Sequence, residues 1–143
     1  MKNLRSVLSV LSVLAVLLLA TPARAQQNGV KADVPFDFVV GNRAYPAGEY
    51  TLKAALNDSH IVRIENMNEV SAAFTQSNPC SKGQPSKETK LVFHRMGGHY
   101  FLYQVWTAGY TTGREFPKGR IEVELAQNHE QPEVVIVAAV ISR

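Results

Sequence analysis

The fold is decided by the stretch from Lys90 to Trp106, which reads KLVFHRM, GG, HYFLYQVW. Two runs rich in β-branched and aromatic residues flank a glycine pair, and glycine adopts the positive φ angles that a two-residue hairpin turn requires. The pattern predicts an antiparallel hairpin in which Met96 lies opposite His99 and His94 lies opposite Phe101. Both faces of the hairpin are largely apolar near the strand centres, so we expect it in the middle of the domain.

Continued to the ends of both runs, this register divides the side chains between two faces. One face carries Val92, His94, Met96, His99, Phe101, Tyr103 and Val105, and the other carries Leu91, Phe93, Arg95, Tyr100, Leu102, Gln104 and Trp106. His94 and His99 then share a face and lie diagonally across the two strands. Two imidazoles could begin a metal site, but zinc takes at least three protein ligands. We therefore predict no metal site and keep His94 and His99 as weak candidates.

Short runs of alternating apolar residues continue on both sides of the hairpin and predict further strands. They cover residues 34–40, 50–54, 60–65 and 70–75 before the hairpin, and 121–125 and 134–141 after it. For the last two runs a short helix is the alternative. Glycine and proline interrupt residues 107–119, which therefore read as an irregular loop. Seven to eight short antiparallel strands predict an all-β domain, either a β-sandwich or a small barrel.

The N-terminus predicts export. Residues 1–25 combine a basic start, an apolar run over residues 6–20 and the small-x-small sequence Ala23-Arg24-Ala25, as in a secretory signal peptide. The apolar run is shorter than the stretch of about 20 residues that spans a membrane. We expect cleavage, a single domain over residues 26–143, a periplasmic or secreted location and no stable membrane insertion. An uncleaved anchor is the alternative.

The charge balance gives no reason to expect nucleic acid as a partner. The chain has 15 Lys and Arg against 12 Asp and Glu, but Lys2, Arg5 and Arg24 belong to the expected leader. The remaining domain therefore has no excess of basic residues, and an excess is what would point to nucleic acid or to an anionic membrane.

Cys80 is the only cysteine, so a disulfide within the chain is impossible. It lies in a polar, turn-rich stretch, residues 77–86, which predicts a loop. Either the thiol is incidental or it links two chains into a dimer.

Two blocks resemble a group of small exported bacterial proteins of unknown function. One is residues 34–50, VPFDFVVGNRAYPAGEY, in which a PFDF-type strand leads to a PAG-x-Y turn. The other runs from Leu91 through Val105-Trp106 to residues 113–115. In addition, residues 45–52, YPAGEYTL, resemble the turn and strand of prealbumin-like modules on bacterial surfaces. These resemblances imply an exported β-domain and transfer no activity.

A candidate binding surface lies around the glycine-rich loop after the hairpin. Trp106, Tyr110, Arg114 and Phe116 are close in sequence, and aromatic residues and arginine are favoured at recognition sites. The alternative is a solvated loop whose aromatic side chains anchor it to the core.

Motifs of the common enzyme classes are missing, which predicts a non-catalytic protein without a cofactor. Glu122 and Glu124 share one face of the expected strand at 121–125, where we expect them to point into solvent. The sequence favours an interaction or structural module of the periplasm or cell surface that binds another protein. The alternative is a carrier that holds a small apolar ligand near Phe101, Tyr103 and Trp106. An unrecognised hydrolase is a third alternative, ranked behind the carrier.

Overall fold

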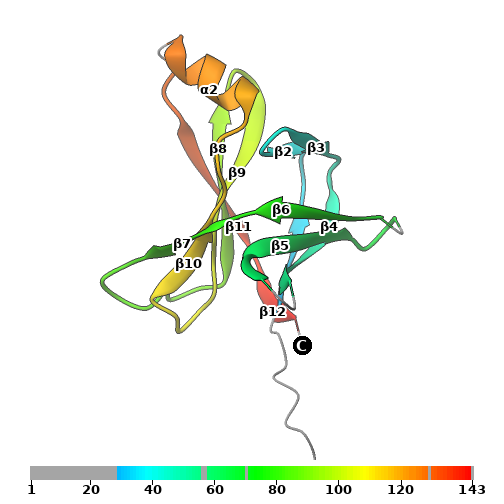
Figure 1. Ribbon diagram of the computed structural model, residues 1–143, viewed down its shortest axis with the longest axis vertical. Helices are drawn as coiled ribbons and strands as arrows, with labels where there is room; N and C mark the ends of the chain where they lie inside the picture. Colours follow the sequence, from blue (N-terminus) through cyan, green and yellow to red (C-terminus); the bar gives the residue numbers. More distant parts are fainter. Residues whose placement is uncertain (1–28, 56–57, 70, 129, 143) are drawn as a thin grey trace, which may run out of the picture.

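The protein is a β-sandwich with one short helix, seen in a computed structural model that describes residues 29–55, 58–69, 71–128 and 130–142 (Figure 1). The expected leader, residues 1–25, lies outside the described residues. The first sheet contains, in spatial order, β12 (Val140–Ser142), β1 (Gly29–Val34), β4 (Gly48–Ala55), β5 (Asp58–Asn66) and β6 (Ser71–Gln76). The second contains β11 (Glu133–Ala138), β8 (Lys90–Met96), β9 (His99–Trp106), β10 (Thr112–Glu115) and β7 (Asn78–Ser81), with β2 (Phe38–Val40) and β3 (Arg43–Tyr45) attached through β2 to β9.

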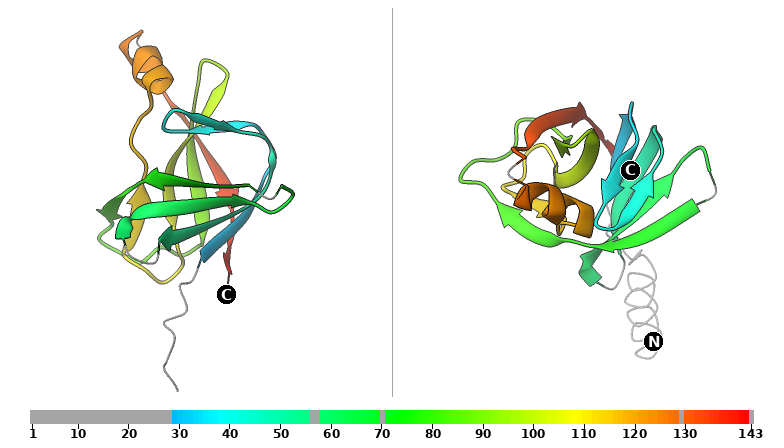
Figure 2. Two further views of the ribbon diagram at one scale, coloured as in Figure 1. Left: turned by 45° about the vertical axis from the view of Figure 1, so that its right-hand side comes forward. Right: turned by 90° about the horizontal axis from the view of Figure 1, so that it is seen from above.

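The all-β prediction is confirmed, and the two sheets do not close into a barrel. The strands of one sheet cross those of the other steeply (Figure 2). The described residues form twelve strands rather than seven or eight, and the β2–β9 pair is parallel. The difference arises because the chain changes sheets within runs that the sequence joins.

Two expected strands are divided where the chain passes between the sheets. The run at 34–40 ends β1 at Val34 and resumes as β2 at Phe38, because Pro35 has no N–H to continue the ladder. The run at 134–141 breaks at Ala139, so that β11 pairs with β8 while β12 pairs with β1. Corners at which a strand leaves one sheet for the other are typical of sandwiches whose sheets cross steeply.

Two stretches expected as loops contain short strands. Cys80 lies in β7, and the glycine-rich stretch at 107–119 contains β10. These two strands pair with each other, with Cys80 opposite Gly113. Neither strand has an alternating apolar pattern. Backbone hydrogen bonds hold them instead, because β10 pairs with β9 on one side and with β7, the edge strand, on the other.

The central hairpin forms as predicted at its turn and departs from the prediction further along. Gly97 and Gly98 have φ angles of 54° and 78°, and Met96 pairs with His99. A β-bulge then shifts the register between Val92 and Phe93, so that Phe93 pairs with Leu102 but Val92 pairs with Gln104. Tyr103 is the extra residue, and beyond it each side chain of β9 points to the side of the sheet opposite to the predicted one.

As a result, residues of β9 that simple alternation would place on one face lie on opposite faces before and after the bulge. Val105 lies in the core between the sheets together with Leu91 and Phe93, whereas Trp106 is buried outside this core. The sequence-based assignment of these two residues was therefore wrong. The alternating pattern contains no signal for a bulge, because Leu102, Tyr103 and Val105 on either side of it can each be placed on a buried face.

Residues expected as a strand at 121–125 instead form the helix α2 (Arg120–Gln127). Figure 1 shows α2 beside the turn of the β8–β9 hairpin. A Cβ on Gly97 would lie 2.9 Å from Leu125 Cδ2, and a Cβ on Gly119 would overlap the backbone of Gly41. The backbone N–H of Arg120 donates a hydrogen bond of 2.8 Å to Asn42 Oδ1. A residue 78 positions away thus caps the helix, which no local pattern could indicate.

One end of the sandwich core is filled by aromatic rings. The Phe38 ring lies 5.0 Å from Tyr50, 5.2 Å from Tyr45 and 5.5 Å from Phe93, measured between centroids. Phe36 stacks on Tyr100 at 3.8 Å and meets Phe93 edge to face at 5.2 Å. We call these six residues the aromatic end.

Polar contacts fix the turn that supplies the aromatic end. The Tyr50 hydroxyl donates to the Pro46 carbonyl at 2.7 Å, and the Ala47 N–H donates to Asp37 Oδ1 at 2.8 Å. The PFDF and PAGEY blocks therefore meet in space and build one packed corner.

Candidate functional site

A pocket of about 400 Å³ opens between the two sheets at the end opposite the aromatic end. Its apolar wall is formed by Val30, Leu52 and Val62 of the first sheet and by Val105 and Phe116 of the second. Each of these five side chains is at most 7% exposed, so the pocket penetrates to the core. The volume lies within the range of small-molecule sites, about 300–1,000 Å³.

A small residue of β4 keeps the pocket open, and a glycine of β10 lets the strand beside it pack closely. Along β4, Tyr50 joins the aromatic end, whereas Ala54, about 13 Å further on the same face, lines the pocket. Gly113 lines it from β10, and a Cβ there would lie 2.7 Å from the Val105 carbonyl oxygen and 2.8 Å from the Trp106 ring. The close packing of β10 against β9 thus requires glycine at this position.

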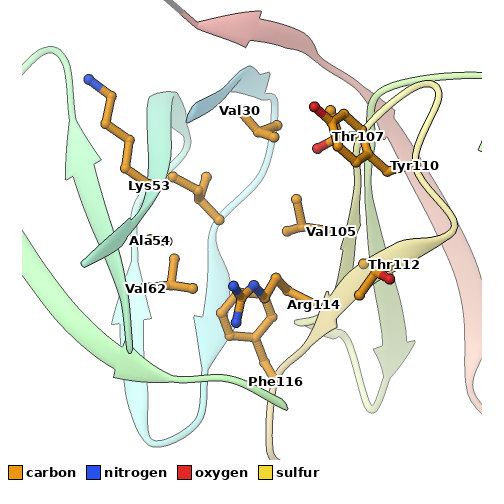
Figure 3. A pocket seen from close by; sticks show the side chains of 12 residues that line it. Val30, Lys53, Ala54, Val62, Val105, Thr107, Tyr110, Thr112, Arg114 and Phe116 are labelled. Atoms are coloured by element: carbon orange, nitrogen blue, oxygen red, sulfur yellow. The ribbon is translucent and has the colours of Figure 1, made fainter. Parts of the chain in front are cut away.

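Polar groups lie around the apolar wall. Figure 3 shows Arg114 extending from β10 toward the middle of the pocket, while Lys53 of β4 carries its amino group away from the middle. Thr107, Tyr110 and Thr112 contribute hydroxyl groups on the side of the second sheet. The described residues that line the pocket include two basic side chains and no carboxylate.

The structure brings three of the four candidate binding residues together. Tyr110, Arg114 and Phe116 all line the pocket. Trp106 does not, because the bulge turns it to the outer side of the sheet, where it is 1% exposed. Its Nε1 donates to Gln104 Oε1 at 3.0 Å, and Lys82 Nζ lies 3.9 Å from the ring centroid.

Phe101 and Tyr103, which the sequence places near an apolar ligand, also lie away from the pocket. Phe101 is buried outside the core cluster between the sheets, and Tyr103 stacks on His94 at 4.0 Å between ring centroids. The apolar wall of the first sheet was missed entirely. Leu52 and Val62 read as ordinary strand residues, whereas Val30 of β1 lies before the first strand that the sequence predicts. Only the packing of the two sheets brings these residues opposite Phe116.

His94 and His99 point to different surroundings. His99 is exposed, whereas the His94 side chain is 13% exposed and its Nδ1 lies 3.6 Å from Glu122 Oε1 of α2. Among the described residues, no hydrogen-bond partner meets this nitrogen. Burial lowers the pKa of His94, and the nearby Lys118 lowers it further, against an opposing effect of Glu115. No group of three or more potential metal ligands occurs in the part of the chain that the structure describes.

Glu122 is buried rather than exposed as expected, at 5% exposure. Burial raises the pKa of this carboxyl group, and Lys118 acts in the opposite direction. The error follows from the change of secondary structure. On a helix Glu122 and Leu125 share the face that meets the sheet, whereas the alternation of a strand grouped Glu122 with Glu124.

Cys80 is half-buried on β7, and burial together with the neighbouring Glu115 raises the pKa of its thiol. A higher pKa reduces the thiolate fraction at neutral pH and slows disulfide exchange. Its role as a link between two chains stays a prediction.

The outer side of the last strands carries an exposed apolar row. Val134 and Ile136 of β11 are 59% and 56% exposed, and Val140 of β12 is 62% exposed. The expected buried closing strand is therefore half-exposed. In the described sheet, β11 is hydrogen-bonded to β8 alone, so that it forms an edge with only its inner face covered.

Comparisons with protein families, with curated proteins and with solved structures found no match to this chain. Within the described residues, no helix is long and apolar enough to cross a membrane.

Proposed function

We propose that this protein is an exported, non-catalytic carrier that holds a small, largely apolar molecule in the pocket between its two sheets. The proposal rests on the difference in packing between the two ends of the core between the sheets. Six aromatic residues fill one end, while about 400 Å³ stays open at the other among side chains that are nearly buried. Binding an apolar ligand would remove this surface from water, at about 25 cal/mol for each Å² covered.

The proposal assigns no reaction to the pocket. Its described lining contains no histidine, cysteine or carboxylate. The buried pair His94 and Glu122 lies on the other side of the second sheet, under α2. A ligand in the pocket is therefore separated from this pair by the sheet itself.

Native mass spectrometry of the protein purified from its source cells tests the proposal directly. We expect additional mass of a few hundred daltons that is lost on denaturation, consistent with a ligand of the size that such pockets hold. A titration with the neutral apolar dye Nile red complements it. Ala54→Leu places a larger side chain in the pocket and should abolish dye binding.

A control separates the pocket from the exposed row on β11. The double variant Val134→Thr, Ile136→Thr removes apolar surface there and should leave dye binding unchanged. Dye binding that survives Ala54→Leu and disappears in the β11 variant would contradict the carrier.

The exposed edge of β11 favours a second candidate, an interaction or structural module of the cell envelope that pairs with a second copy of itself. An antiparallel edge is self-complementary under two-fold symmetry, and Val134 and Ile136 would continue the apolar row across both copies. Sedimentation over a range of concentrations should then show a dimer that Ile136→Lys abolishes. A dimer lost only on reduction would instead involve Cys80, and a monomer at every concentration would exclude this candidate.

A further inference from the structure

Three lysines gather around a shallow hollow on the loop between β7 and β8. The hollow has a volume of about 350 Å³, and its described lining contains Lys82, Lys87 and Lys90 against one carboxylate, that of Glu88. Among the described residues, no ion pair involves any of these lysines. Residues 26–143 have no excess of basic over acidic residues, so the positive charge of this loop is a local concentration.

Backbone hydrogen bonds hold this loop against the loop between β9 and β10. The Lys82 N–H donates to the Thr111 carbonyl at 2.8 Å, and the Ser86 N–H donates to the Tyr110 carbonyl at 2.9 Å. In return, the Gly109 N–H donates to the Ser86 carbonyl at 2.8 Å. Figure 1 shows the two loops at the end of the second sheet away from α2. The lysines are therefore carried by a backbone whose position is fixed before any partner binds.

Two of the lysines leave the second sheet on the same side. Lys82 Nζ lies 3.9 Å from the centroid of the Trp106 ring, and Lys90 pairs with Trp106 across β8 and β9. Residues directly opposite each other in an antiparallel pair share a face. Because Trp106 is buried and hydrogen-bonded on the outer side of the sheet, it fixes the side on which this charge gathers.

These features fit a broad anionic surface better than a single bound anion. Lysine is a strongly hydrated point charge on a flexible stem, without the planar donors with which arginine fixes one carboxylate or phosphate. Tyr110 on the neighbouring loop is 56% exposed, and tyrosine is enriched where proteins meet the membrane–water interface. A membrane that contains anionic lipids presents a negative surface of this kind to clustered lysines.

We infer that these two loops dock the protein on an anionic lipid membrane, with Lys82, Lys87 and Lys90 toward the lipid headgroups. Tyr110 and Thr107 of the second loop also line the pocket between the sheets. A membrane in contact with the loops thus lies beside the pocket, which gives an apolar ligand a short path between pocket and lipid. Docking requires no ligand in the pocket, so this inference does not rest on the carrier proposal.

Sedimentation with lipid vesicles tests the inference on the protein purified from its source cells. We expect vesicles of phosphatidylcholine with about 30% phosphatidylglycerol to bind about tenfold to a hundredfold more tightly than phosphatidylcholine alone, because each lysine near the surface adds attraction. Raising the NaCl concentration from about 0.05 M to about 0.5 M should remove most of this preference, since salt screens exposed charges. Equal binding to both kinds of vesicle, or binding to neither, would overturn the inference.

Two triple variants locate the charge that matters. The first, Lys82→Gln, Lys87→Gln and Lys90→Gln, should lose most of the preference for anionic vesicles. The matched control removes the same charge from exposed ion pairs of the first sheet and from α2, through Lys31→Gln, Arg63→Gln and Arg120→Gln.

The control variant should bind anionic vesicles as the wild type does. An equal loss in both triple variants would overturn the inference, because it would show an effect of net charge. If the first variant fails to fold, Lys87→Gln alone should lower the affinity by a smaller factor, since Lys87 is exposed.

Ala54→Leu separates docking from the uptake of lipid by the pocket. This variant should bind anionic vesicles as the wild type does, because Ala54 lies inside the pocket and outside both loops. Loss of vesicle binding in Ala54→Leu would overturn the docking surface and assign the binding to the pocket. Vesicle binding by a protein that takes up no Nile red would leave docking in place and overturn the carrier.

Discussion

The two ends of the sandwich core use the same strands in opposite ways. At one end Phe36, Phe38, Tyr45, Tyr50 and their neighbours pack ring against ring. At the other end β4 and β5 present Ala54 and Val62, and the space between the sheets stays open. The large residues supply packing that holds the two sheets together, so the smaller residues at the other end do not have to fill the space between the sheets.

This difference in packing predicts that the same kind of substitution changes stability differently at the two ends of the core. Each of the following pairs changes the aromatic end and the pocket in the same chemical way. Equal effects of the two substitutions in any pair would argue against this difference between the two ends.

The largest difference is expected for removal of a phenylalanine ring. Phe93→Ala should lower the free energy of unfolding by about 3–5 kcal/mol, because Phe93 is fully buried against Phe36 and Phe38. Phe116→Ala should cost clearly less, since the Phe116 ring borders a pocket and already lacks packing partners on one side. Urea denaturation of both variants measures the two losses, and equal losses would show that the pocket end is packed as tightly as the aromatic end.

Enlarging an alanine gives the next effect. Ala32→Leu should destabilise the protein by about 1–3 kcal/mol, because Ala32 is 4% exposed and pairs with Tyr50 at the aromatic end. Ala54→Leu should leave the free energy of unfolding unchanged or raise it, because the added atoms enter the pocket. Thermal melts without ligand distinguish them. A large loss in Ala54→Leu would mean that the open volume at this position cannot take a leucine.

Removal of a tyrosine hydroxyl follows. Tyr50→Phe should cost about 1 kcal/mol, since the hydroxyl donates to Pro46 and accepts from Asn66 Nδ2 at 3.3 Å. Tyr110→Phe should leave stability unchanged, because Tyr110 is 56% exposed at the pocket. Chemical denaturation at one pH is sufficient, and a loss at Tyr110 equal to that at Tyr50 would indicate a structural role for the loop tyrosine.

The smallest effect is expected at a third packed region, between α2 and the outer side of β8, where packing encloses ionisable groups. The raised pKa of Glu122 means that the folded state binds its proton more tightly than the unfolded chain does. The free energy of unfolding should therefore fall as the pH rises from the ordinary glutamate pKa to the raised value. Glu122→Gln should remove this fall, so that its advantage over the wild type is larger at about pH 8 than at about pH 4.

His94 should act in the opposite direction in the same region. Its pKa is lowered, so the unfolded chain binds more protons, and the free energy of unfolding should fall as the pH drops below the ordinary histidine value of about 6.5. His94→Gln should remove that loss. An identical pH dependence in the wild type and both variants would show that neither group titrates differently on folding.

Local sequence patterns determined the longer β-strands from β4 to β6, the hairpin of β8 and β9 with its turn, and the proximity of Tyr110, Arg114 and Phe116. Alternating apolar residues and paired glycines act over a few residues, so their consequences can be predicted without knowledge of the fold. The same reasoning failed at α2, where an alternating run forms a helix because Asn42 caps it and the hairpin turn receives Leu125. It failed again at Trp106, because one extra residue in β9 reverses a face without changing the composition.

Only the tertiary structure decided where the pocket lies. Five of its twelve lining residues come from β1, β4 and β5, which are separated from Arg114 by about 50 residues or more and meet it only across the two sheets. The tertiary structure also placed Ala54 beyond the reach of the aromatic rings that fill the other end. A cavity is the space that packing leaves unfilled, so it depends on all the strands at once and has no signal in any single one.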